Sequence, residues 1–157
     1  MQSLPDEILI REFTMDDEKL VKDFFDQMGG ETKALFDRGN GNRNNAMKFF
    51  DKTSDNTVYF LVEHNGIMVG YLFLWDMDKS IIWLGIAVHD TIKGKGLGKK
   101  LMSHAEEYAK KHGKGGILLT THLANLRGQV LYERSGYERL GIHNQFMELL
   151  YLRRFDT

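Results

Sequence analysis

Short apolar runs alternate with polar segments in the first third of the chain. Residues 7–13, "EILIREF", form a short run that predicts a strand. Apolar residues then recur at helical spacing over 20–28, which predicts a helix stopped by Gly29. The polar stretch 29–45 predicts a loop, and 45–52 predicts a further short helix.

The middle of the chain is rich in β-forming residues. Two apolar runs within 57–78 are separated by Asn65 and Gly66, a turn signal that predicts an antiparallel hairpin. The following run, 80–89, is continuously apolar, so it predicts a strand that is covered on both faces.

The remaining predicted elements are a helix, a strand, a short helix and a closing hairpin, over residues 97–113, 116–123, 125–136, and 137–142 with 146–154. The whole order is strand, helices, three strands, helix, strand, helix, two strands. It predicts a single α/β domain with one mixed, mostly antiparallel sheet of about seven strands and helices on both faces.

Composition narrows the class of protein. The 157 residues suit one domain, and 42% apolar with 11% aromatic residues indicates a packed globule. Because 21 basic and 22 acidic residues leave a net charge of −1, nucleic acid and anionic membranes are not expected as partners. The absence of cysteine excludes disulfides, a thiolate nucleophile and thiolate-bound zinc, and we expect no metal. No leader or membrane-length apolar run is present, so we expect a cytoplasmic protein.

The stretch "IAVHDTIKGKGLGKKLM", residues 86–102, carries a predicted strand through a glycine-rich turn into a helix. The amide groups at the start of a helix favour an anion such as phosphate. Glycines let the backbone approach that anion closely, and lysines add positive charge. The residues concerned are Lys93, Gly94, Lys95, Gly96, Gly98, Lys99 and Lys100. A surface turn with solvated lysines is the alternative.

Two familiar phosphate-binding motifs do not fit this turn. Both the Walker loop and the dinucleotide fingerprint, started at Gly94, require a glycine where Lys99 stands.

The window from Lys93 through Leu97 to Gly98 resembles the coenzyme-binding signature of the GNAT superfamily of acyl-CoA-dependent N-acyltransferases. That signature is Arg or Gln, two residues, Gly, one residue, then Gly or Ala. Lys93 departs conservatively from it, and Asp90 stands where many relatives have proline. A second block, "NLRGQVLYERSGY", is similar to another family motif, with Gly128 in place of a common alanine; its matching positions are Asn125, Leu131, Tyr132, Gly136 and Tyr137. The resemblance covers nearly the whole chain, and implies one N-acetyltransferase domain over 1–157.

The resemblance implies a particular site. The fourth and fifth strands should splay apart, with the pantetheine arm of acetyl-CoA, the co-substrate, lying beside Ile86, Ala87 and Val88. The turn from Lys93 to Lys99 would hold the pyrophosphate. A backbone N–H near Val88 would stabilise the oxyanion that forms as the amine attacks.

Two residues of the second block have roles by the same resemblance. Tyr132, with an ordinary pKa of about 10, would protonate the departing thiolate. Its alternative is a core aromatic residue. Asn125 would contact the coenzyme, and it is also a natural helix N-cap.

The base that deprotonates the amine is less defined. Many relatives carry a glutamate on one of the two splayed strands, at places where this chain has Ser80 and Thr120. Residues that remain open for this role, through water, are His122, His89, Asp76 and Glu63.

The resemblance implies direct transfer of an acetyl group from acetyl-CoA to a primary amine within a ternary complex. The expected acceptor is a small molecule, bordered by 29–45 and 143–145; protein amino termini or lysines are the alternative. A non-catalytic acyl-CoA sensor and an interaction module with Phe24, Phe25, Phe49 and Phe50 as its surface also remain open. Either a monomer or a homodimer is expected.

Overall fold

One seven-stranded sheet organises the chain, in the order β1-β2-β3-β4-β5-β7-β6. The computed structural model describes residues 8–27, 41–52, 56–89, 96–143 and 147–155. The strands are β1 Ile8–Glu12, β2 Val58–His64, β3 Ile67–Trp75, β4 Ile81–Val88, β5 Gly116–His122, β6 Glu138–Ile142 and β7 Glu148–Arg154. The β4–β5 pair is parallel and the other neighbours are antiparallel, as the α/β prediction required.

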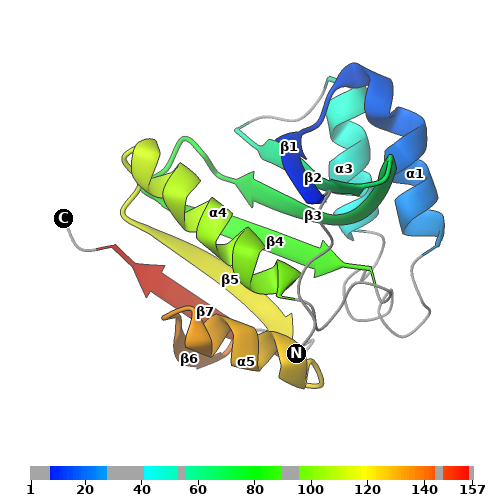
Figure 1. Ribbon diagram of the computed structural model, residues 1–157. Coiled ribbons are helices and arrows are strands. Elements are labelled where there is room, and N and C mark those ends of the chain that lie inside the picture. The colour runs from blue at the N-terminus through cyan, green and yellow to red at the C-terminus, as the bar shows by residue number, and fades with distance from the viewer. Residues whose placement is uncertain (1–7, 28–40, 53–55, 90–95, 144–146, 156–157) are drawn as a thin grey trace.

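Helices cover both faces of this sheet (Figure 1). They are η1 Met15–Asp17, a single 3-10 turn, then α1 Glu18–Asp26, α3 Gly41–Phe50, α4 Leu97–Lys111 and α5 Leu126–Arg134. Figure 1 shows α4 and α5 on one face, and α1 with α3 on the other, over β1 to β3. This arrangement confirms the predicted fold class.

Two buried clusters follow from these layers. Residues of α4 and α5 pack with every second residue of the strands, such as Leu84 and Leu119, in the larger cluster. The smaller cluster is aromatic and joins α1 and α3 to β2 and β3; Tyr71 and Phe73 stack there with ring centroids 4.4 Å apart. Successive residues of a strand face opposite sides of the sheet, so alternation decides which cluster each side chain joins.

The hairpin prediction is confirmed in detail. Asn65 and Gly66 both have positive φ, 53° and 78°, as a two-residue hairpin turn of type I′ requires.

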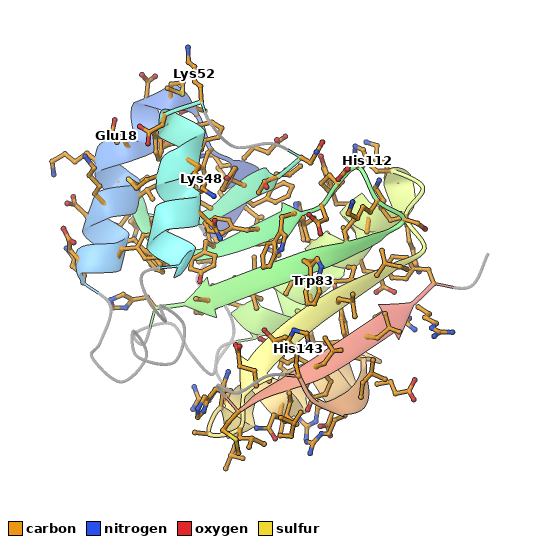
Figure 2. The ribbon with its side chains drawn as sticks, turned by 180° about the vertical axis from the view of Figure 1, so that it is seen from behind. Glu18, Lys48, Lys52, Trp83, His112 and His143 are labelled. Carbon is orange, nitrogen blue, oxygen red and sulfur yellow. The ribbon has the colours of Figure 1, made fainter. Side chains whose placement is uncertain are left out.

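Three sequence predictions need correction or qualification. The second helix begins at Gly41 rather than at 45. The first helix ends at Asp26, and its predicted stop, Gly29, lies outside the described residues. β4 is not covered on both faces along its length, because Ile81 and Trp83 are only half-buried. The helices α1 and α3 lie over β1 to β3 and leave this part of the face open (Figure 2).

Candidate functional site

A gap opens between β4 and β5. The two strands pair in parallel only from Ile81 with Gly116 to Trp83 with Leu118, although each continues for several residues. Both remain paired on their other sides, β4 with β3 and β5 with β7. The neighbours therefore hold the strands apart, and the backbone that borders the gap is left without a strand partner.

The register shows which groups of β4 border the gap. The His89 N–H donates to the Val69 carbonyl at 2.7 Å. Every second residue before His89 along β4 therefore also turns its backbone N–H and C=O groups toward β3. The residues between them, Ile86 and Val88, turn their N–H and C=O groups toward β5. Ala87 instead pairs with Tyr71. Of the three β4 residues named from the sequence, Ile86 and Val88 thus offer backbone groups to the gap.

The same reasoning applies to β5. The Leu123 N–H donates to the Met147 carbonyl at 3.0 Å, continuing the β5–β7 ladder. By alternation the backbone groups of Thr120 point away from β7, into the gap. Its side chain and that of Thr121 lie on opposite faces of the sheet.

The start of α4 lies just beyond β4 in the chain. Gly96 is the N-cap, with φ of 83° and no side chain to cap the helix. The amides of Leu97, Gly98 and Lys99 form the first turn and lack intrahelical acceptors, as at any helix start. Lys93, Gly94 and Lys95, also predicted here, lie outside the described residues.

Gly98 has a packing role as well. A β-carbon at this position would lie 3.0 Å from Leu131 Cδ2, so its small size lets the first turn of α4 approach α5 closely. Between these helices is a groove of about 380 Å³. Three cations line it, Lys99 from α4 and Arg127 and Arg134 from α5, beside the buried Tyr137.

Asn125 joins the gap to α5. Its Oδ1 accepts a hydrogen bond from the Gly128 N–H at 3.1 Å, so it is the predicted N-cap. Its Nδ2 donates to Thr121 Oγ1 at 2.9 Å, on the buried face of β5. The amide therefore ties the start of α5 to the strand that borders the gap.

Tyr132 is buried in α5, with 3% of its surface exposed. It belongs to the same cluster as Ile86, and its ring centroid lies 5.8 Å from that of Tyr151. Burial raises the pKa of the Tyr132 phenol above its ordinary value, with a smaller contribution from Tyr151. The hydroxyl therefore stays protonated at neutral pH.

The structure separates the residues considered as a base. The Ser80 carbonyl accepts from the Gly115 N–H at 2.8 Å, so Ser80 lies at the paired end of β4 and β5, away from the gap. Asp76 precedes it in the same β3–β4 turn. Glu63 is bound by Arg11 at 3.0 Å, on the far strands β1 and β2.

Three of the residues considered lie at the gap, and one relevant residue was missed. His89 directly follows the last residue of β4. Thr120 and His122 are on the half of β5 that borders the gap. His122 Nδ1 accepts from the Ala124 N–H at 3.0 Å, which leaves the ring proton on Nε2. Glu148, which the sequence did not single out, accepts from Thr120 Oγ1 at 3.3 Å. No sequence motif marks Glu148, because it lies on β7, outside the two motifs that resemble the family.

Within the described ranges, no group of three or more His, Asp or Glu residues is arranged to hold a metal ion. In the same part of the chain, no helix is long and apolar enough to cross a bilayer.

Comparison with known proteins gives a consistent result. The model of the acetyltransferase (GNAT) family matches residues 18–137. The uncharacterized N-acetyltransferase YhfO of Bacillus subtilis (strain 168) is 30% identical over 88 residues, which are 52% of this chain and 59% of that protein. The match thus spans less than two thirds of this relative.

Solved structures share the fold. The GNAT domain of S. lividans PAT has a TM-score of 0.78 at 15% identity, covering 93% of this chain and 89% of that chain. The structure of yncA from Salmonella typhimurium with its cofactor acetyl-CoA has a TM-score of 0.74 at 17% identity, and the match covers 97% of this chain and 96% of that chain. The protein belongs to the acetyltransferase (GNAT) family, because the family model spans most of the chain.

Proposed function

We propose that this protein is an N-acetyltransferase that moves an acetyl group from acetyl-CoA to the primary amine of a small molecule. The observation that carries the proposal is the gap between β4 and β5, where Ile86 and Val88 expose backbone groups beside the uncapped start of α4. An extended pantetheine arm needs such strand-like partners, and a pyrophosphate needs such amides.

The residues fit the coenzyme in three further respects. The amides of Leu97, Gly98 and Lys99 converge at the positive end of a 15-residue helix. The groove between α4 and α5 offers three cations for the phosphates of the nucleotide end. Asn125 retains one amide hydrogen beyond its bond to Thr121, and we assign it a contact with the coenzyme.

The chemistry requires no enzyme nucleophile. The amine nitrogen forms a bond to the thioester carbonyl carbon, and the Val88 N–H stabilises the oxyanion. The C–S bond then breaks, the Tyr132 hydroxyl gives its proton to the thiolate, and the nitrogen loses a proton to solvent as the amide forms. Solvent then reprotonates the Tyr132 phenolate. The raised pKa of Tyr132 keeps this proton in place until sulfur departs.

A thiol-release assay tests the proposal. The chain has no cysteine, so a thiol reagent reports only the coenzyme A that is set free. We expect release from acetyl-CoA that depends on an added small amine. Release only with peptides indicates a protein acetyltransferase, and coenzyme binding without release across the panel indicates a sensor; either result refutes the proposal.

Two variants probe the assigned roles. Tyr132→Phe should lower kcat more than it lowers coenzyme affinity, because it removes a proton and little contact area. Tyr137→Phe is the matched control: it removes another buried phenol, 6.4 Å away between ring centroids, and should leave kcat near the wild-type value. Equal losses for the two variants would contradict the role of Tyr132.

The third variant tests the helix start. Gly96→Asp should weaken acetyl-CoA binding, because it brings negative charge to the phosphates. Gly96→Asn imposes a similar strain at φ of 83° without the charge and serves as the control. If the two variants bind acetyl-CoA with similar affinity, this turn does not hold the phosphates.

A further inference from the structure

Among the helices that the structure describes, none covers the face of the sheet opposite α4 and α5 over β4, β5 and β7, and this face borders the gap (Figure 2). Side chains there follow the register in rows: Trp83, Leu118 and Leu152 form one row, and Thr120 with Leu150 forms the next. Figure 2 shows Trp83 and His143 on this face, clear of α1 and α3.

Aromatic rings form one side of this surface. The rings of Trp75 and Trp83 are stacked, with centroids 6.5 Å apart and planes within 7°. His143, at the end of β6, brings its ring to 6.1 Å from Trp83. The Trp75 ring lies over Gly85, where a β-carbon would be 3.0 Å from Cζ3. The result is a half-exposed aromatic wall at the point where β4 leaves β5.

A carboxylate lies on the other side. The strands β4, β5 and β7 contribute a single acidic residue, Glu148. Leu149 is buried toward α4 and α5, so by alternation Glu148 faces the open side with Thr120. The 3.3 Å bond to Thr120 holds its carboxylate above the part of β5 that borders the gap.

The two faces of the gap thus differ in chemistry. Tyr132 lies in the cluster beneath α4 and α5, whereas Glu148 lies on the opposite face. The reaction at the thioester carbonyl needs one group that donates a proton to the sulfur and a second group that accepts a proton from the ammonium. Their placement on opposite faces lets each act without blocking the other.

We propose that Glu148 binds the ammonium group of the acceptor and takes its proton, and that the acceptor is a singly charged amine carried on an aromatic or aliphatic body. This inference rests on the proposed function. One proton passes from the ammonium to Glu148, directly or through one water. The freed nitrogen then attacks the thioester carbonyl and becomes cationic, and it loses a second proton to solvent as the thiolate departs and takes the Tyr132 proton. Glu148 returns its own proton to solvent after transfer.

The dimensions and charge favour this class of acceptor. Same-face residues two apart along a strand are separated by roughly 7 Å. The carboxylate above Thr120 would bind the nitrogen of the acceptor, and the apolar row at Trp83 would bind its ring. This separation suits an acceptor whose nitrogen and ring are joined by about two methylene groups. A polyamine or aminoglycoside would need further carboxylates, and the described strands at the gap offer only Glu148.

Other ionisable groups also lie on this face of the sheet. His122, His143 and His89 are the described ones near the gap, His89 by alternation from Ala87 at the end of β4. Glu138, which pairs with Leu152, and Arg154 lie toward the far end of β7. His122 Nδ1 is occupied by the Ala124 N–H, which removes its lone pair from the reaction. Glu138 shares the face but is exposed on the edge strand β6, which makes it a matched control.

The test compares Glu148→Gln with Glu138→Gln across pH, with 2-phenylethylamine as the acceptor. We expect Glu148→Gln to lower kcat/KM at least about 100-fold at pH 7, as for loss of a general base. The deficit should shrink as pH approaches about 10, where the free amine is supplied by solution. Glu138→Gln should match the wild type, and acetyl-CoA affinity should be unchanged in both.

Several outcomes would overturn the inference. It fails if Glu148→Gln keeps kcat/KM within about threefold, or if its deficit is the same at every pH. If the inference fails but the wild-type protein binds acetyl-CoA and acetylates amines, the proposed function still stands. If the wild-type protein does neither, both the inference and the proposed function are refuted. Should Glu148→Gln fold poorly in a thermal melt, Glu148→Asp replaces it, and an unchanged rate there also counts against the inference.

The acceptor class has its own test. We expect kcat/KM for 2-phenylethylamine to exceed that for spermidine by about tenfold or more, and Trp83→Ala to reduce this preference by raising KM. A preference for spermidine would overturn the acceptor assignment.

Discussion

Asn125 connects stability to function, because one side chain caps α5 and holds β5. Its Oδ1 accepts from the Gly128 N–H at 3.1 Å, and its Nδ2 donates to Thr121, which is 4% exposed. Asn125→Ala removes both bonds. Losing an N-cap costs about 1 kcal/mol, and leaving a buried hydroxyl without its partner costs about 1 kcal/mol more.

The expected loss is thus about 2 kcal/mol of unfolding free energy, the sum of these two estimates. For a domain of this size that lowers Tm by roughly 4 to 8 °C. Asn125→Asp is the matched variant. Its carboxylate still accepts from Gly128 and from the Thr121 hydroxyl, and its charge suits a helix start, so its stability should stay within about 1 kcal/mol of wild type.

Chemical denaturation and thermal melts measure the stabilities, and calorimetry with acetyl-CoA measures binding. The aspartate variant separates the two roles: it keeps the cap but loses the amide donor, so it should bind the coenzyme more weakly while remaining stable. The reasoning is refuted if Asn125→Ala is as stable as wild type, or if Asn125→Asp is destabilised as much as Asn125→Ala.

Three further predictions concern stability. The Asp17 carboxylate accepts from Arg11 at 2.8 and 2.9 Å, and these bonds, foremost among several causes, lower the pKa of Asp17. Asp17→Asn should therefore destabilise the protein by roughly 1 to 3 kcal/mol at pH 7. The difference should shrink as pH falls below about 4, the ordinary pKa of an Asp in the unfolded chain, because the carboxylate becomes protonated as pH falls toward its lower pKa in the folded state; a difference that grows with acid would contradict this. Gly70→Ala would put a β-carbon 2.9 Å from the Ala87 carbonyl oxygen, so it should cost about 1 to 3 kcal/mol and weaken acetyl-CoA binding by shifting β4, which unchanged melts and affinity would disprove. At Gly113 a β-carbon would meet open space, but φ is 73°, which strains any other residue. Gly113→Ala should therefore lower the free energy of unfolding in a denaturant titration by about 1 kcal/mol, and an unchanged value would show that the backbone conformation does not require glycine here.

Local patterns were enough to predict most elements of the fold. The alternation around Asn65 and Gly66 fixed a hairpin, because a two-residue turn with positive φ at both positions suits those residues. Helical spacing after Gly96 fixed α4, and Gly113 fixed its end. The errors fell where local signals are weak: α3 begins in a polar, glycine-containing stretch whose helix depends on its packing against α1 and β2.

The candidate site divides in the same way. The sequence by itself determined the groups that belong to contiguous motifs, namely the uncapped glycine start of α4, the cap at Asn125, and Tyr132, which follows Leu131 and lies about one helical turn after Gly128. These depend on spacings of a few residues, which local backbone geometry fixes. Only the tertiary structure decided where β4 parts from β5, which amides of Ile86 and Val88 face the gap, and that Glu148 reaches Thr120 from a strand 28 residues further along the chain. The physical reason is that strand register and the order β4-β5-β7 are set by packing of the whole sheet, which no short stretch of sequence contains.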